Sequence, residues 1–295
     1  NKIVLNRSVH VLVSAIEHSS IYDTVVILQQ YGIAFDYIPV MASGKIDLDV
    51  YRRLFRPDTK LVSVMLANNE IGCIQDIAAL SAIAHEYGAL FHSDAVQALG
   101  KTSICLKELE VDYMSFSAHK IYAPKGVGAL YVKDDSLLKP LLDGAHHERS
   151  MRASTENVPG IYAFEKAVEL IDVDAYQAYT LPLKTYFVQL LREHISDIVF
   201  NHCEDGLTNT VNVSFIGLDG HALAMNCDLE GINVSTGSAC SVGSIELSHV
   251  LKAKGITDRL NQSTLRFSFG LMSEMQDCDV VVDRLIAIVD RMRAI

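Results

Sequence analysis

The sequence predicts an α/β protein in which helices cover both faces of a mostly parallel sheet. Three observations support this fold class. Short apolar segments alternate with longer segments that have helical periodicity. The 295 residues provide enough chain for two lobes, each with its own core. Hydrophobic residues make up 49% of the chain and charged residues 21%, which is an ordinary balance for a globular protein.

The alternation of strands and helices is clearest in the first half of the chain. The segment 60–66, KLVSVML, is predicted to be a buried strand, and 77–88, IAALSAIAHEYG, an amphipathic helix that ends at a glycine. Further strands are predicted at 89–95, 111–118 and 128–133. Parallel strands joined by helices bring their carboxyl ends to one edge of the sheet, where a ligand is expected.

The second half of the chain has a different pattern. Residues 153–171 are predicted to form a loop and then a long helix that leads out of the first lobe. After it, strand-like segments at 209–217, 231–240 and 263–270 alternate with helical stretches, which indicates a smaller α+β lobe. We therefore expect a large domain at 1–172 and a small carboxyl-terminal domain at 173–295.

Composition argues against several classes of protein. The net charge of −11, without a block of lysine and arginine, argues against binding to nucleic acid or to an anionic membrane. No apolar run approaches the ~20 residues of a membrane span, and the first residues lack the features of a signal peptide. The six cysteines have no CxxC spacing. We expect a reducing compartment, the cytoplasm, with an organelle as the alternative.

Polar side chains follow three of the predicted strands directly. The three groups are Asn68-Asn69-Glu70, His92-Asp94-Gln97 and Ser117-His119-Lys120. An aldehyde cofactor with a pyridine ring and a phosphate requires these residue types. A lysine amine forms an imine with the aldehyde, and a buried carboxylate keeps the ring nitrogen protonated. Amide side chains can bind the ring hydroxyl, and serine and histidine can donate to the phosphate.

Each of these residues also has a simpler interpretation. A lone aspartate after a strand is most often a helix N-cap, and Lys120 alone would be a solvated surface charge. His92 and Asp94, or the triplet 146–148 (HHE), could be metal ligands, but neither set offers a third ligand at a suitable spacing. The occurrence of all three groups together favours the cofactor site.

Five longer motifs resemble those of a known family. They are LANNEIGCIQDI, FHSDAVQALGK, SFSAHKIYAPKGVGALYV, STENVPGI and STGSACS. They look like the motifs of cysteine desulfurases, which are pyridoxal 5'-phosphate enzymes of fold type I in the class V aminotransferase group. The resemblance extends from about Val11 to the carboxyl terminus. The GSACS form is similar to the group I subfamily, which supplies sulfur for iron–sulfur cluster assembly.

The resemblance implies roles around the cofactor ring. Lys120 would bond to the cofactor aldehyde, and Asp94 would pair with the pyridinium nitrogen. Gln97 and Asn69 would lie near the ring hydroxyl, with Asn69 also near the substrate. His18, in AIEHSS, would stack on the ring and move protons.

The resemblance also implies contacts with the phosphate and the substrate. Ser117 and His119 would bind the phosphate, and Thr155 would reach the phosphate of a neighbouring subunit, which implies a homodimer. Arg266 would hold the substrate carboxylate with its planar guanidinium group.

One cysteine decides the expected reaction. Cys240 lies among small and polar residues, NVSTGSACSVGS, which are typical of an exposed loop, whereas Cys105 and Cys227 are expected to be buried. The resemblance implies that the Cys240 thiolate takes the sulfur of L-cysteine as a persulfide, with His18 as the candidate base. L-alanine would leave, and an acceptor or scaffold protein of iron–sulfur assembly would receive the sulfur.

The beginning of the family pattern has no counterpart in this sequence. In the family, a Gly-Ala-Thr-Glu-type turn at a helix N-terminus binds the phosphate, and it precedes the strand that here begins in VHVLVSAIEH. A protein without that turn is expected to hold the cofactor more weakly. A truncated, inactive scaffold is therefore one alternative. The others are a selenocysteine lyase and a class V aminotransferase; Cys240 argues against the last.

Overall fold

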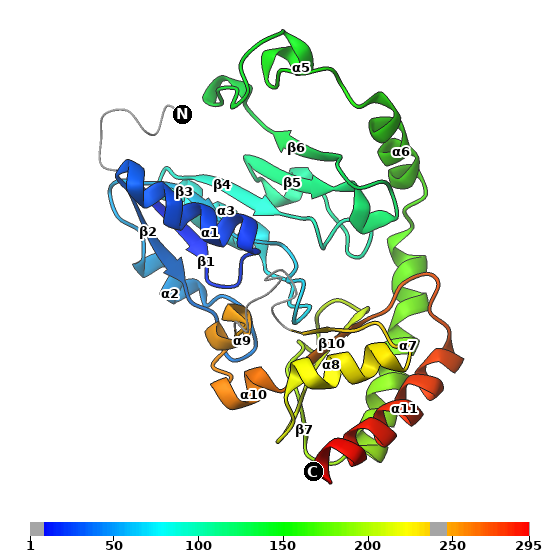
Figure 1. The fold of residues 1–295 in the computed structure, drawn as a ribbon. Helices are drawn as coiled ribbons and strands as arrows, with labels where there is room; N and C mark the ends of the chain where they lie inside the picture. Colours follow the sequence, from blue (N-terminus) through cyan, green and yellow to red (C-terminus); the bar gives the residue numbers. More distant parts are fainter. Residues whose placement is uncertain (1–8, 237–246, 295) are drawn as a thin grey trace. The chain divides into compact units, whose positions relative to one another are not determined.

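The computed structural model describes residues 9–236 and 247–294 (Figure 1). The contacts divide the chain into two units. Unit 1 comprises residues 1–39, 46–66 and 75–172, and unit 2 comprises residues 40–45, 67–74 and 173–295. Two short segments from the first half of the chain thus belong to unit 2, in contrast to the contiguous boundary expected after residue 172.

In the described part of the chain, unit 1 contains a six-stranded sheet with the order β2-β1-β3-β4-β5-β6. Strands β1 to β5 run parallel, and β6 runs antiparallel to β5. The mostly parallel sheet predicted from the sequence is therefore confirmed. The strands are β1 (Val9–Ser14), β2 (Ile33–Ile38), β3 (Thr59–Ser63), β4 (Leu90–Asp94), β5 (Tyr113–Ser117) and β6 (Gly128–Val132).

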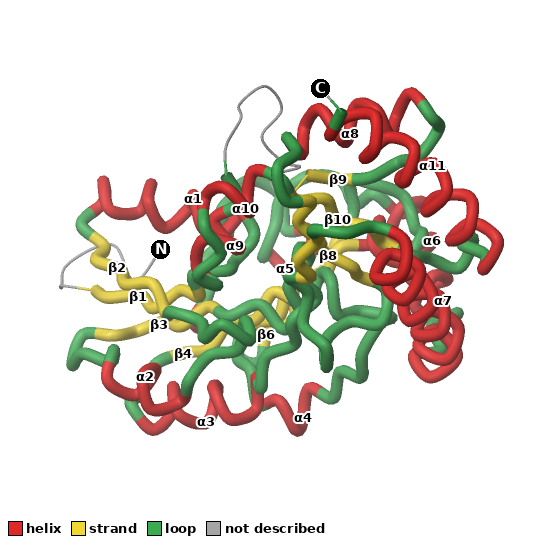
Figure 2. Tube along the Cα trace, turned by 90° about the horizontal axis from the view of Figure 1, so that it is seen from below, coloured by secondary structure: helices red, strands yellow, loops and turns green. Residues whose placement is uncertain are grey.

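Helices lie on both sides of this sheet: α1 on one, α2 and α3 on the other (Figure 2). The α3 helix begins where the Asp76 side chain accepts from the Ala79 amide at 3.1 Å, and the glycine predicted to end it, Gly88, has a φ of +71°. The helices of unit 1 are α1 (Ser19–Leu28), η1 (Gln29–Tyr31), α2 (Leu48–Arg53), α3 (Ile77–Glu86), α4 (Leu106–Leu109), η2 (Ala118–Ile121), η3 (Asp135–Leu137), α5 (His147–Ser150) and α6 (Val158–Glu169).

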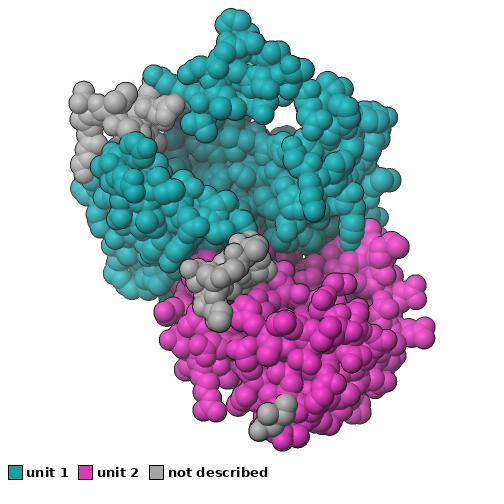
Figure 3. All heavy atoms as spheres, in the orientation of Figure 1, with its two compact units in different colours: residues 1–39, 46–66, 75–172 teal, residues 40–45, 67–74, 173–295 magenta. Residues whose placement is uncertain are grey.

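Unit 2, magenta in Figure 3, contains in its described residues a four-stranded antiparallel sheet with the order β7-β8-β10-β9. Helices α7 and α11 lie side by side (Figure 1) and pack on this sheet through a core that includes Phe187, Val213, Leu265 and Leu285. The elements are α7 (Val173–His194), β7 (Ile198–Phe200), β8 (Thr210–Phe215), α8 (Gly220–Leu229), β9 (Ser235–Thr236), α9 (His249–Ala253), α10 (Asp258–Gln262), β10 (Thr264–Ser268) and α11 (Met275–Arg293).

The sequence predicts buried side chains for Cys227 and Cys105, and the structure confirms this only for Cys227. Cys227 lies on the inner side of α8 and is fully buried in the core of unit 2, as expected. Cys105 is exposed, so the prediction of a buried side chain is wrong. The physical reason is its position immediately before α4, a helix of one turn that has no buried residue of its own. Within the two described ranges, no helix is both long and apolar enough to cross a membrane.

Candidate active site

Four of the predicted site residues lie at the carboxyl ends of the parallel strands of unit 1. Asp94 is the last residue of β4, and Ser117 is the last residue of β5. His18 follows β1 as the N-cap of α1, and Lys120 lies in η2 directly after β5. Because parallel strands end at one edge of a sheet, these four residues share the edge that the sequence predicted for a ligand.

Asp94 is the buried carboxylate of this edge, with 7% of its surface exposed. Burial raises the pKa of Asp94 above its usual value of 3.8, while the Val96 amide and the positive charges of His18 and Lys120 counteract the shift. The Val96 amide donates to Oδ1 at 2.8 Å. His18, Asp94 and Lys120 are therefore close enough to interact electrostatically, and a cationic ring nitrogen beside Asp94 would stabilise its charged form.

Gln97 is held by a lysine that the sequence motifs did not point to. The Lys101 ammonium group donates to the backbone oxygen of Gln97 at 3.2 Å and to its Oε1 at 3.0 Å. Only 8% of Lys101 is exposed, and burial, together with the charge of Lys120, lowers its pKa to about 8. The i, i+4 spacing in QALGK is the signal that could have suggested this pair.

The predicted phosphate ligands also contact each other. Ser117 Oγ lies 2.8 Å from His119 Nδ1. Burial lowers the pKa of His119, and the positive charges of Lys120, Lys125 and Lys101 lower it further. This surplus of positive charge suits a phosphate dianion. Thr155 is exposed between α5 and α6, and its contact with a neighbouring subunit stays a prediction.

A second buried acid near Asp94 was missed. Glu17 is fully buried after β1, and its Oε1 accepts a hydrogen bond from the Met65 amide. Burial raises the pKa of Glu17 well above its usual value, and the neighbouring Asp94 raises it further. Burial and the charge of Asp94 thus both favour the neutral form of Glu17 over its charged form. Nothing in the segment AIEHSS distinguishes Glu17 from a solvated glutamate.

His92, considered as a metal ligand, is held by two serine hydroxyls. Its Nδ1 lies 2.9 Å from Ser63 Oγ, and its Nε2 lies 2.8 Å from Ser115 Oγ, on the two flanking strands. Burial lowers the pKa of His92 to about 4, so the ring is neutral. Across residues 9–236 and 247–294, no three His, Cys, Asp or Glu side chains gather in a way that could hold a metal ion.

The two predicted substrate ligands lie together in unit 2. Arg266, on β10, donates from Nη1 to the backbone oxygen of Asn69 at 3.0 Å. The next residue, Glu70, is 6% exposed and accepts a hydrogen bond from the Ser248 hydroxyl. Burial raises the pKa of Glu70 to about 7, although the Ser248 contact and the Arg266 charge oppose the shift. The side-chain oxygen of Asn68 accepts from two following amides and shapes this turn.

The donor set of unit 1 fits pyridoxal 5'-phosphate. It combines a lysine, a buried carboxylate for a ring cation and a serine–histidine pair for a phosphate, within a field made positive by three lysines. These are the groups that such a cofactor requires, and they belong to consecutive strands of one sheet. Cys240 lies outside the described residues.

Comparisons with known proteins identify the family to which this chain belongs. Residues 1–281 match the family described as aminotransferase class-V. The chain is 40% identical over 289 residues to "Cysteine desulfurase IscS" of Dictyoglomus turgidum, an alignment that covers 97% of this chain and 73% of that protein. It is 42% identical over 287 residues to "Cysteine desulfurase" of Gluconacetobacter diazotrophicus, covering 96% of this chain and 72% of that one.

Solved structures of NifS-like proteins are also similar to this chain. A "NIFS-LIKE PROTEIN" superposes with a TM-score of 0.91 at 32% identity, covering 98% of this chain and 77% of the other. The NifS-like protein from Rickettsia africae superposes with a TM-score of 0.86 at 30% identity, covering 95% and 76% of the two chains. The chain therefore belongs to the class-V aminotransferase family and, within it, to the cysteine desulfurases.

Proposed function

We propose that this protein is a pyridoxal 5'-phosphate-dependent enzyme that converts L-cysteine to L-alanine and retains the sulfur as a persulfide on Cys240. The observation that carries the proposal is the arrangement of Asp94, His18 and Lys120 at one edge of the sheet, where the buried Asp94 carboxylate interacts electrostatically with the other two side chains. Family membership supplies the reaction class, and this arrangement supplies the residues.

We assign the cofactor contacts as follows from the donor set. Lys120 would be the covalent anchor, Asp94 the partner of the ring nitrogen, and Gln97 and Asn69 the partners of the ring oxygen. Ser117 and His119 would hold the phosphate, and Thr155 of one subunit would complete the site of the other in a homodimer. Bound pyridoxal 5'-phosphate supplies an electron sink for the substrate α-carbon. In this proposal residues 1–172, apart from segments 40–45 and 67–74 that belong to unit 2, form the cofactor domain, and 173–295 form the main part of the small domain.

In this proposal His18 transfers protons and Arg266 orients the substrate. His18 Nδ1 lies 2.9 Å from Ser20 Oγ and accepts from the Ser20 amide at 3.2 Å, so we assign proton exchange to the other ring nitrogen, Nε2. Arg266 binds the carboxylate of L-cysteine through its guanidinium fork. The contact with the Asn69 carbonyl fixes the direction of that fork.

Cys240 receives the sulfur. Its thiolate attacks the thiol sulfur of the substrate, a new S–S bond forms, and the Cβ–S bond of the substrate breaks. The electron pair of the broken bond stays with the carbon skeleton, which takes up a proton and leaves as L-alanine. Cys240 then carries one additional sulfur atom, which it passes to a thiol of an acceptor or scaffold protein.

The test compares Cys240→Ser with Cys105→Ser, which removes an exposed thiol that has no part in the proposal. After incubation with L-cysteine, peptide mass analysis of the wild type and of Cys105→Ser should show one added sulfur on Cys240. Cys240→Ser should lose this sulfur and on the order of 10³-fold or more of the alanine-forming rate. Borohydride should still fix the cofactor to Lys120 in all three proteins. Retained alanine formation in Cys240→Ser would refute the assignment.

A further inference from the structure

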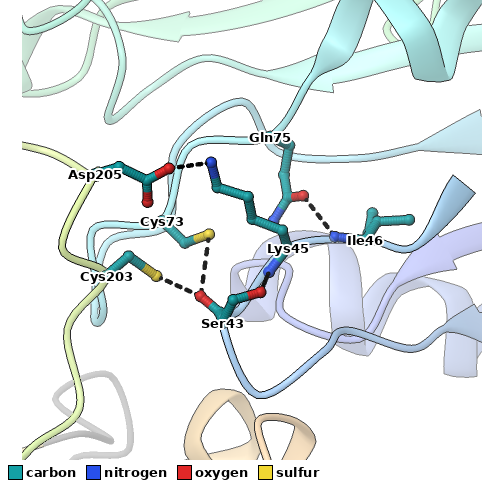
Figure 4. A network of polar contacts seen from close by, with 7 residues as sticks. All are labelled: Ser43, Lys45, Ile46, Cys73, Gln75, Cys203 and Asp205. Atoms are coloured by element: carbon teal, nitrogen blue, oxygen red, sulfur yellow. Dashed lines mark hydrogen bonds and ion pairs between the residues drawn. The ribbon is translucent and has the colours of Figure 1, made fainter.

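Two cysteines that are far apart in the sequence lie side by side in unit 2 (Figure 4). The sulfur of Cys203 lies 2.8 Å and that of Cys73 lies 3.8 Å from the same atom, the backbone oxygen of Ser43. A side-chain hydrogen bond also connects the two thiols. Both residues are buried.

Two backbone hydrogen bonds and the close approach of Gly44 hold the segments around the two thiols. The Cys203 amide donates to the Ile71 oxygen at 2.9 Å, and the Leu207 amide donates to the Gly72 oxygen at 2.7 Å. A Cβ atom on Gly44 would lie 3.1 Å from the Cys203 sulfur and 3.3 Å from the Cys73 Cβ. The segments around residues 44, 73 and 203 therefore hold the two sulfur atoms around one backbone oxygen, where a bond between them can be tested.

The two thiols have different chemical character. The hydrogen bond from Cys73 lowers the pKa of Cys203, as do the positive charges of Lys254 and Lys45, against burial and the charge of Asp205. The same hydrogen bond and burial raise the pKa of Cys73. Lys45 is itself anchored by its ion pair with Asp205 (Figure 4). The two shifts run in opposite directions, so the surroundings favour the thiolate form more at Cys203 than at Cys73.

We propose that Cys73 and Cys203 form a reversible disulfide when the protein meets hydrogen peroxide, with Cys203 oxidised first. The Cys203 thiolate attacks one peroxide oxygen, the O–O bond breaks, and the hydroxide released takes up the thiol proton and leaves as water. The Cys73 sulfur then attacks the Cys203 sulfenic acid, the S–O bond breaks, and a second water leaves with the Cys73 proton. Two thiols lose two electrons, and one peroxide becomes two waters.

The bond would join segment 67–74 to the loop that contains Cys203. Segment 67–74 carries Asn69, the residue whose backbone holds Arg266. The proposal concerns thiol chemistry alone and does not depend on the proposed desulfurase activity.

The first test uses the wild-type protein, freed of reductant and treated with hydrogen peroxide. Mass analysis without reduction should show one cross-linked peptide pair, containing Cys73 and Cys203 and lighter by two hydrogens, which dithiothreitol separates again. Burial raises the pKa values of Cys227 and Cys278 to about 11, so these two thiols serve as internal references that stay reduced at the same dose. A disulfide between any other pair, or full alkylation of Cys73 and Cys203 after peroxide treatment, would overturn the proposal.

Variants test the order of the two steps. In Cys73→Ser, a sulfenic acid probe such as dimedone should label position 203, whereas in Cys203→Ser it should leave position 73 unlabelled. Lys45→Met removes the positive charge beside the pair and should slow cross-linking severalfold, compared with Lys60→Met, which removes an exposed lysine of unit 1. Equal labelling at both positions, or an unchanged rate in Lys45→Met, would contradict the assigned order.

Discussion

Each unit of this protein holds a carboxylate that is almost fully buried, yet the two carboxylates are surrounded differently. Asp94 in unit 1 is 7% exposed, and Glu70 in unit 2 is 6% exposed. Asp94 ends a parallel strand and faces His18 and Lys120. Glu70 lies in a turn and receives the hydroxyl of Ser248, while the side chain of Asn212 donates to its backbone oxygen at 3.2 Å.

The difference indicates that burial alone does not distinguish the carboxylate that we propose as the partner of the cofactor ring. Side-chain and backbone hydrogen bonds of Glu70 hold its segment in place. Its pKa of about 7 results from the free-energy cost of burying its charge. Asp94 lies at the carboxyl ends of the parallel strands of unit 1, beside the lysine that would anchor a cofactor. The partners of each carboxylate, rather than its exposure, therefore determine its role. The following substitutions test that distinction, beginning with the largest expected effect.

Asp94→Asn should nearly abolish activity. Asparagine keeps the size of the side chain and can still accept from the Val96 amide, but it loses the negative charge that would pair with a ring cation. Loss of this charge-assisted contact should lower kcat on the order of 10³-fold. The measurement is the rate of alanine formation, together with the visible spectrum of the bound cofactor. Asp135→Asn, which changes an exposed aspartate, serves as the control. A kcat within a few-fold of the wild type would disprove the role of Asp94.

Arg266→Lys should weaken substrate binding. Lysine keeps the positive charge but lacks the planar fork that can hold a carboxylate through two hydrogen bonds and contact Asn69 at the same time. We expect the KM for L-cysteine to rise roughly 10- to 100-fold, with a smaller change in kcat. Steady-state kinetics measure both constants, and Arg259→Lys, on the exposed side of α10, is the matched control. An unchanged KM would remove Arg266 from the substrate site.

Glu70→Gln should change how stability depends on pH. The pKa of Glu70 is about 7 in the folded protein, against an ordinary value of 4.5 for a solvated glutamate, so between these values the folded protein holds a proton that the unfolded chain releases. The free energy of unfolding therefore falls as pH rises through this window, by about 1.4 kcal/mol per pH unit from this one group. Glutamine has no proton to release. Between pH 5 and 7.5 the variant should lose about 2–3 kcal/mol less stability than the wild type.

Urea unfolding at the two pH values measures this difference for Glu70. Glu108→Gln, which changes an exposed glutamate, should behave like the wild type. If Glu70→Gln and the wild type show parallel pH profiles, Glu70 does not take up a proton on folding, and the contrast with Asp94 fails.

Much of the site of unit 1 could be predicted from sequence because its signals are local. The predicted strands at 60–66, 89–95 and 111–118 correspond to β3, β4 and β5; polar residues lie at the ends of β4 and β5, and a few residues after the end of β3. The rule that parallel strands end at one edge then brings these residues together without knowledge of the structure. Asp94 and Lys120 were found in this way.

The remaining features depend on contacts between distant segments. The buried Glu17 accepts a hydrogen bond from the Met65 amide, in the segment after β3, and Cys73 lies beside Cys203 because the two segments exchange backbone hydrogen bonds. Segment 67–74 belongs to unit 2 although unit 1 flanks it in the sequence. Periodicity and turn residues describe only neighbours along the chain, so none of these arrangements leaves a local signal.

Lys101→Met should have the smallest effect, because Lys101 contacts the proposed cofactor site through Gln97 and supplies only one of the three lysine charges near His119. Methionine keeps the unbranched apolar stem in this buried position but cannot donate to the Gln97 backbone oxygen and Oε1. The loss of one oriented hydrogen-bonding partner, worth about 1 kcal/mol, should raise the dissociation constant of pyridoxal 5'-phosphate roughly fivefold. Titration of the cofactor into the apoprotein measures this constant, with Lys107→Met as the exposed control.

Because the pKa of Lys101 is about 8, the ratio of the variant to the wild-type dissociation constant should shrink as pH rises above that value. A ratio that stays constant from pH 7 to 9 would show that the ammonium charge does not orient Gln97.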